Sequence, residues 1–453
     1  IITKKGRGKI SGFLSAEAGS FDTYRERAGL SGGNDLFNYS LGLSRWDTNG
    51  ISSADVDDSN EEEDGYENTT FSSRLGITPT EFFGVDLIFR YVDAESELDN
   101  SGGFGGDDPN HVGETQQLFL RGQADLSLFD GLWDQQLGFS FTDNDRDVTN
   151  DTDVNHPNDL VDSSYEGQII RFDWQHNLHL HETNTLTLGV ETEEDQGESD
   201  YYSESAWGAF TTIFEEETAR TCGYYLQDEI RLWDCWFTTL GVRLDDHDRF
   251  GSETTYRVAS SYLIRDTGTR IRGTYGTGFK APSLYQLFSQ YGDPGLEPEE
   301  SVGWDLGLEQ SLFDDTFTVG VTYFSNDFED LIDFDSGTST YVNVAEAESD
   351  GVELFASCQP FDDLTLRVSY TYTDTEDEKT GEELLRRAGN KFGFNANYRF
   401  LEKGNVHLDC DYVGARDDMD YSTWPASRVE LDGYVLVDLA ASYDITKNVQ
   451  VFG

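Results

Sequence analysis

Residues 115–128, TQQLFLRGQADLSL, alternate between apolar and polar side chains. One parity is apolar or small and contains Leu118, Leu120, Gly122, Ala124, Leu126 and Leu128. The other parity is polar apart from Phe119 and contains Gln117, Arg121, Gln123, Asp125 and Ser127. Because successive side chains of a β-strand point to opposite faces of a sheet, this segment predicts a strand with one apolar and one polar face.

The same alternation recurs along almost the whole chain. In 364–373, one parity holds Leu364, Leu366 and Val368, and the other holds Thr365, Arg367 and Ser369. In 302–309, Val302, Trp304, Leu306 and Leu308 oppose Gly303, Asp305, Gly307 and Glu309. The chain is therefore predicted to be all-β and built from two-faced strands.

The connections between these strands are of two alternating kinds. Short ones fall at 129–134, 181–183, 233–234, 265–268 and 361–363. Long, acidic ones are expected at 47–66, 97–114, 143–162, 197–217, 246–254, 374–386 and 414–430. A strand, a short turn, a strand and a long loop in repetition are typical of an outer-membrane barrel, with tight periplasmic turns and long outer loops.

The strand count favours a closed transmembrane antiparallel up-and-down β-barrel. The pattern gives about twenty complete strands of roughly ten or more residues, and the start of another at 448–453. A soluble β-sandwich would need shorter strands, and a single open sheet of this size would flatten or split. In the barrel, the apolar parity faces lipid and the polar parity lines a lumen that holds water or a plug.

Composition excludes other classes of protein. The 453 residues carry 88 acidic and 31 basic side chains, a formal net charge of -57 at pH 7. A nucleic-acid-binding protein needs a basic face to displace counterions from phosphate, so that class is excluded. The 13% aromatic content and the 8 Pro argue against intrinsic disorder. No linker is evident, so residues 1–453 are expected to form one domain.

The stretch 272–310, RGTYGTGFKAPSLYQLFSQYGDPGLEPEESVGWDLGLEQ, resembles a hallmark of TonB-dependent receptors of Gram-negative outer membranes, with Asp293 in place of the usual Asn. Segments 1–21, 224–246 and 341–360 are similar to other parts of these barrels, in the same order. The cobalamin (vitamin B12) receptors are the most similar subgroup, and siderophore receptors share most of these motifs.

This resemblance implies energy-coupled uptake of a scarce nutrient such as cobalamin, a ferric siderophore or haem. It also implies an integral outer-membrane monomer in contact with lipid and lipopolysaccharide. The family closes its barrel with about 22 strands and reaches the TonB complex through an N-terminal plug. The plug and the last one or more strands of the barrel are therefore expected to lie outside this chain. A passive outer-membrane porin is the alternative function.

The motif also has a direct structural interpretation. Pro282 cannot donate to a strand ladder, so a strand is expected to end at Lys280. Pro294, Gly295 and Pro298 should form turns that let the next strand begin at about Glu300. A corner between two strands is the favoured role for this segment, and direct ligand contact by Lys280 or Tyr285 is the alternative.

The loop 47–66, DTNGISSADVDDSNEEEDGY, combines clustered carboxylates with Gly. Calcium takes six to eight oxygen ligands, so such a loop suits it, although position twelve of an EF-hand would fall on Phe71. By resemblance, cobalamin receptors bind calcium at the corresponding loop. A local match then points to Asp47, Glu62, Asp64 and Asp93, and a solvated acidic loop is the alternative.

Other candidate chemistry is weaker. Loop 143–162 is a second, poorer candidate for cations. His176, His179 and His181 cannot converge on one metal ion, because His181 lies in a tight turn and His176 and His179 have opposite parities. No nucleophile, Walker or Rossmann motif is present, so no catalytic residue and no enzymatic role are expected.

Overall fold

The computed structural model describes residues 4–52, 62–99, 106, 108–154, 156–335, 337–420 and 425–453. The first half is formed by β1 (Ser11–Ala18), β2 (Tyr24–Gly33), β3 (Phe37–Thr48), β4 (Tyr66–Thr80), β5 (Phe83–Glu97), β6 (His111–Leu128), β7 (Trp133–Asn150), β8 (Leu160–His181), β9 (Asn184–Ser205), β10 (Gly208–Leu232), β11 (Trp236–His247) and β12 (Gly251–Ile264). The second half is formed by β13 (Thr269–Lys280), α1 (Leu284–Phe288), β14 (Glu299–Leu312), β15 (Phe317–Asp335), β16 (Thr340–Phe361), β17 (Leu364–Asp377), β18 (Asn390–Phe400), β19 (Gly404–Val413), β20 (Arg416–Asp420), β21 (Ser427–Leu431), β22 (Tyr434–Thr446) and β23 (Val449–Phe452).

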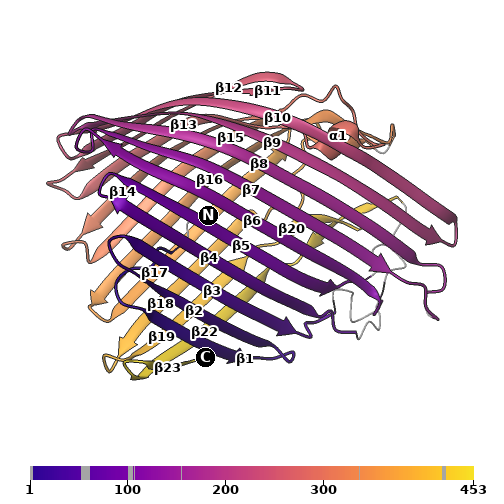
Figure 1. Cartoon of the computed structure of the whole chain (residues 1–453), viewed down its shortest axis with the longest axis horizontal. Coiled ribbons are helices and arrows are strands. Elements are labelled where there is room, and N and C mark those ends of the chain that lie inside the picture. Colours follow the sequence, from indigo (N-terminus) through magenta and orange to yellow (C-terminus); the bar gives the residue numbers. More distant parts are fainter. Residues whose placement is uncertain are drawn as a thin grey trace.

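One antiparallel sheet of 21 strands forms the wall of the molecule. Each strand from β1 to β19 pairs with its neighbours in the sequence, β19 then pairs with β22, and β22 pairs with β23. Figure 1 shows this wall as oblique strands that curve round into a barrel shape. The strands β20 and β21 form a separate hairpin in the last outer connection. The all-β class, the up-and-down order and the predicted strand count are confirmed.

The short connections close as tight turns. Between β10 and β11, the Cys235 N–H donates to the Leu232 carbonyl (3.2 Å), and the central residues Trp233 and Asp234 have φ of 52° and 53°. Two successive left-handed residues define a type I′ turn, whose twist matches that of the flanking strands. The predicted tight turn at 233–234 is therefore confirmed.

Two of the predicted long loops are wrong. Residues 197–217 are mostly strand, because β9 continues to Ser205 and β10 begins at Gly208. Residues 246–254 contain only a short turn, since β11 ends at His247 and β12 begins at Gly251. Acidic residues have low β-propensity, but these strands are hydrogen-bonded to neighbours on both sides, and this tertiary pairing decides the structure.

Adjacent rows of the sheet show how the two faces differ. One row passes across neighbouring strands through Leu41, Ser73, Phe89, Leu120, Phe141 and Ile170. The next row, on the opposite face, passes through Ser40, Arg74, Ile88, Arg121, Ser140 and Arg171. The apolar parity therefore forms a continuous outer face and the polar parity an inner one, as the alternation predicts.

Helical structure is minimal in the described part of the chain. The helix α1 has 5 residues and lies between β13 and β14. No described helix is long and apolar enough to cross a membrane.

Candidate ligand-binding site on the inner wall

The connection from β13 to β14, residues 281–298, is called here the α1 segment. β13 ends at Lys280 and β14 begins at Glu299, so the strand ends predicted from the Pro and Gly residues are confirmed. The helix inside the segment was not predicted. Ser283 caps it: Ser283 Oγ accepts from the Gln286 N–H (3.2 Å), and the Ser283 N–H donates to Gln286 Oε1 (2.8 Å). This reciprocal capping box satisfies two N–H groups at the start of the helix.

Hydrogen bonds attach the α1 segment to the surrounding wall. Gln290 Nε2 donates to Thr212 Oγ1 on β10 (2.7 Å). Asn343 on β16 bonds Glu297 in both directions: Asn343 Nδ2 donates to the Glu297 carbonyl (2.9 Å), and the Glu297 N–H donates to Asn343 Oδ1 (2.9 Å). The segment is therefore held at its middle and near its C-terminal end.

Aromatic contacts complete this attachment. The Tyr285 ring lies 5.9 Å from that of Phe214 and 6.3 Å from that of Tyr341, both edge-on. Phe214 is only 3% exposed, and Leu287 of α1 is 2% exposed. Edge-on aromatic pairs at this spacing are favourable beyond the area they bury. Tyr285, an alternative ligand contact in the sequence, is thus a rigid part of the inner wall.

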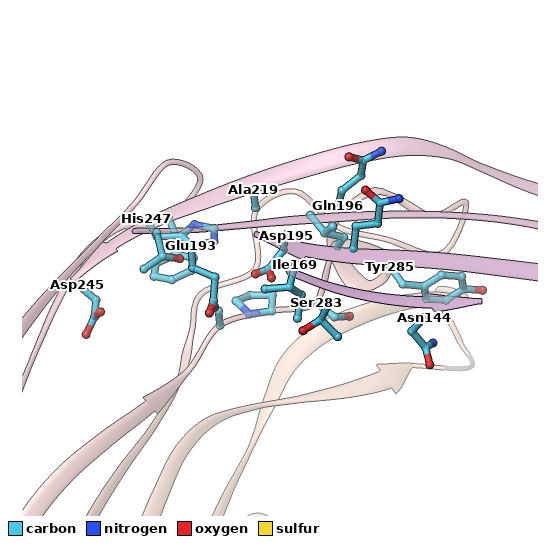
Figure 2. A pocket seen from close by; sticks show the side chains of 18 of the residues that line it. Asn144, Ile169, Glu193, Asp195, Gln196, Ala219, Asp245, His247, Ser283 and Tyr285 are labelled. Carbon is cyan, nitrogen blue, oxygen red and sulfur yellow. The ribbon is translucent and has the colours of Figure 1, made fainter. Parts of the chain in front are cut away.

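A cavity of about 720 Å³ lies between the α1 segment and the inner face of β7 to β11. Figure 2 shows Asp245 and Tyr285 toward opposite ends of it, with Glu193 and Asp195 between them. Ser283 and Tyr285 reach the cavity from the α1 segment, and the acidic side chains reach it from β9 and β11. This volume lies within the range of pockets that bind small molecules.

The cavity continues into a row of ion pairs on the inner wall. Arg243 Nη2 lies 2.6 Å from Glu191 Oε1 and 2.6 Å from Asp245 Oδ1. Arg171 also pairs with Glu191. Of the described residues that line the cavity, Arg243 is the only Arg or Lys, against the acids Glu191, Glu193, Asp195 and Asp245. The cavity is therefore acidic on balance, and these wall residues were not singled out in the sequence.

Lys280, the other alternative ligand contact, lies at the end of β13. Its Nζ is 3.0 Å from Glu299 Oε2, and its side chain is 66% exposed. The described cavity lining includes Ala281 and Pro282 but not Lys280. The structure therefore gives Lys280 a partner at the strand end, and Tyr285 is the one of the two that lines the cavity.

The four predicted calcium ligands fall in two places. Asp47 on β3 and Asp93 on β5 lie on the outer face of the sheet, past the apolar part of their strands. The strand β4 lies between them. Arg45 Nη2 lies 3.2 Å from Asp47 Oδ2, and Arg45 shares the cross-strand row of Asp93. Glu62 and Asp64 are half-buried at the end of the β3–β4 connection. Residues 53–61 of that loop lie outside the described residues, and calcium binding stays a prediction.

Comparison with known proteins agrees with this architecture. The family model described as TonB dependent receptor-like, beta-barrel, matches residues 27–453. The chain belongs to the TonB-dependent receptor family. The vitamin B12 transporter BtuB of Photobacterium profundum is 29% identical over 475 residues, covering 100% of this receptor and 70% of the relative.

Solved structures share the fold of this receptor. The ferric yersiniabactin uptake receptor FyuA of Yersinia pestis superposes with a TM-score of 0.80 at 14% identity, covering 99% of this chain and 75% of that one. The ferripyoverdine receptor of Pseudomonas aeruginosa gives a TM-score of 0.79 at 17% identity, covering 98% and 67%. The receptor is therefore an outer-membrane β-barrel with its apolar outer face toward lipid, in a family of transporters and receptors.

Proposed function

We propose that this receptor takes up cobalamin, or a closely similar corrinoid, in an energy-coupled step that depends on TonB. The observation that carries the proposal is the 29% identity to a vitamin B12 transporter along the whole chain. The siderophore receptors with the same fold are only 14% and 17% identical. Family membership also favours a receptor over the passive porin that the alternation of strands and loops left open.

The charge of the inner-wall cavity supports this choice of ligand. Arg243 compensates Glu191 and Asp245, whereas Asp195 forms no ion pair among the described residues. Bringing an anion into such a site costs Coulomb energy at low dielectric. A ligand without net negative charge, such as cyanocobalamin, fits this wall better than an anionic ferric chelate.

The cargo can be tested by equilibrium titration of the full-length receptor in detergent. Cyanocobalamin is expected to bind at least tenfold more tightly than ferric tris-catecholate. The reverse order would overturn the choice of cobalamin. Tyr285→Ala should weaken cobalamin binding by about tenfold, because one anchoring aromatic contributes about 1–2 kcal/mol. Tyr262→Ala, on the outer face of β12, is the matched control and should bind as wild type.

We also propose that calcium binds at the β3–β4 loop, with Glu62 and Asp64 as the leading ligands. Carboxylate oxygens are the ligands that calcium prefers, and both side chains are half-buried. Asp47 already has Arg45 as a partner, and Asp93 lies on the same wall, so these two are the weaker members.

We further propose that the receptor acts as a monomer and contacts lipopolysaccharide through its acidic outer surface. Four neighbouring strands place carboxylates side by side in one row of the outer face, at Asp47, Glu67, Glu95 and Glu114. Lipopolysaccharide phosphates would meet such a surface through bridging divalent ions. Native mass spectrometry of the detergent-solubilised receptor, with and without chelator, reports both the stoichiometry and bound lipopolysaccharide.

A further inference from the structure

The described residues of two outer connections lie close together. They are 98–99, 106 and 108–110, between β5 and β6, and 151–154 and 156–159, between β7 and β8. His111, the first residue of β6, pairs with Asn150, the last residue of β7. Both residues belong to the inner-face parity of their strands. The two connections therefore leave the wall side by side, although they lie far apart in the sequence.

Three potential metal ligands converge where these connections meet. Asp108 comes from the first connection, Asp153 and His156 come from the second, and their ligand atoms all lie within 4.8 Å of one another. His156 Nδ1 lies 3.6 Å from Asp108 Oδ1 and 3.6 Å from Asp153 Oδ2. These separations are too long for hydrogen bonds. A tetrahedral ion with ligand bonds of ~2.1 Å places neighbouring ligand atoms about 3.4 Å apart, which is close to the observed spacing.

A buried side chain gives independent evidence for a ligand. Asn150 is 1% exposed, and its Nδ2 donates to Asp108 Oδ2 (2.8 Å), so its amide group lies against the cluster. Asn150 Oδ1 and His156 Nδ1 are buried atoms without a hydrogen-bond partner in the structure. A buried polar atom with no partner costs free energy, and a bound cation would supply one.

Backbone hydrogen bonds also hold Asp153 and His156 close together. The His156 N–H donates to Asp153 Oδ1 (2.6 Å), and the Asp153 N–H donates to the His156 carbonyl (3.2 Å). These two bonds hold Asp153 and His156 next to each other, with both side chains beside Asp108. The Asp108 carboxylate is fully buried, with 0% exposure of its side chain, so the cluster is shielded from bulk water on that side.

We propose that Asp108, Asp153 and His156 form a binding site for a divalent transition-metal ion of the Zn²⁺ class, with Asn150 orienting Asp108. An imidazole nitrogen with two carboxylates suits Zn²⁺ and similar ions, whereas calcium and magnesium require oxygen ligands throughout. The site differs in its residues and in its chemistry from the calcium loop at 47–66. The bound ion links two outer connections, whichever nutrient the receptor carries.

Metal binding can be measured directly on the full-length receptor. Chelator-treated protein in detergent is titrated with Co²⁺, followed by its visible absorption, and Co²⁺ is then displaced with Zn²⁺. We expect one saturable Co²⁺ site with a tetrahedral spectrum that Zn²⁺ removes and that equal concentrations of Ca²⁺ or Mg²⁺ leave unchanged. His156→Ala and Asp153→Asn should each abolish this spectrum. Asn150→Ala should weaken binding by about 10- to 100-fold, as for a group that orients a ligand.

Two matched variants control for nonspecific effects. His181→Ala removes an exposed His from the opposite end of the barrel, and Asp151→Asn removes an exposed Asp from the same connection. Both should keep the wild-type spectrum and affinity. Heat-modifiable migration on gels confirms that each variant is folded before it is titrated. The proposal is overturned if the wild type shows no saturable Co²⁺ site, or if His156→Ala binds Co²⁺ as His181→Ala does.

Discussion

Arg121 on β6 and Asp173 on β8 form an ion pair, with Nη2 2.7 Å from Oδ1, although β7 lies between their strands. Gly138 of β7 makes this possible, because a Cβ at that position would overlap both partners. A glycine in a strand often marks such a close approach of neighbouring groups. The same arrangement recurs at Gly223 of β10, where a Cβ would collide with Arg243.

Gly138→Leu should destabilise the barrel by about 1–3 kcal/mol, because the added side chain displaces the ion pair from the inner wall. The measurement is the free energy of unfolding in lipid, from guanidinium titration. Gly122→Leu is the matched control: Gly122 lies on the outer face of β6, with nothing within 4 Å of an added Cβ. The Gly122 variant should unfold as wild type, and equal losses in the two variants would contradict the role given to Gly138.

Val368→Arg should cost about 2–4 kcal/mol, because it places a charge on the lipid-facing side of β17 near the middle of the bilayer. Leu364→Arg, beside the short turn at 362–363, should cost only about 0–1 kcal/mol, since the membrane interface lies close by. Ser369→Arg, on the inner face, should be tolerated. Unfolding of the three variants in lipid tests the assignment of the two faces. The assignment of the faces is wrong if Ser369→Arg lowers the free energy of unfolding as much as Val368→Arg does.

The parts of the fold that alternation could predict are those inside the membrane. There one face of a strand meets lipid and the other meets the lumen, so apolar Leu120 next to charged Arg121 identifies a strand in the sequence. Above the membrane both faces of β9 meet water, the contrast disappears, and Glu198 and Asp200 look like part of an acidic loop. This loss of contrast explains why residues 197–217 were assigned to a loop.

The candidate site was predictable only in part, for a different reason. The motif at 272–310 pointed to Tyr285, but the acidic wall opposite depends on the register of three strands, β9, β10 and β11. Glu191, Gly223 and Asp245 share one row, and a shift of one residue would turn Glu191 to the outer face. Ser283 and Gln286 form a capping box that the sequence contains, yet a helix of 5 residues is too short for periodicity to detect.

Calcium should order the loop 47–66, because carboxylates brought together without a cation repel one another. Hydrogen exchange across 47–66 is expected to slow when calcium is added to the full-length receptor. Glu62→Gln with Asp64→Asn should remove this protection, whereas Asp47→Asn should leave most of it, since Asp47 already pairs with Arg45. Identical exchange with and without calcium would leave only a solvated acidic loop.

Glu378, directly after β17, should make the outer connection 378–389 sensitive to pH. A hydrogen bond with Glu348 is the main cause that raises the pKa of Glu378 from 4.5 to about 7, with further contributions from burial and from Glu346. The Glu378 N–H also donates to the Glu346 carbonyl (3.0 Å), which holds the three side chains together. A carboxyl group with a raised pKa in the folded state stabilises that state below its usual pKa, and the contribution is lost as pH rises through the folded value.

Protection of residues 378–389 against hydrogen exchange, corrected for intrinsic rates, should therefore be high at pH 5 and should fall between about pH 5 and pH 8. Glu348→Gln should abolish this fall, because a Gln amide can donate to the ionised Glu378 carboxylate. Glu402→Gln, in the short turn at the opposite end of the barrel, should behave as wild type. If the Glu348 variant keeps the wild-type pH profile, the proton shared with Glu348 does not control this connection.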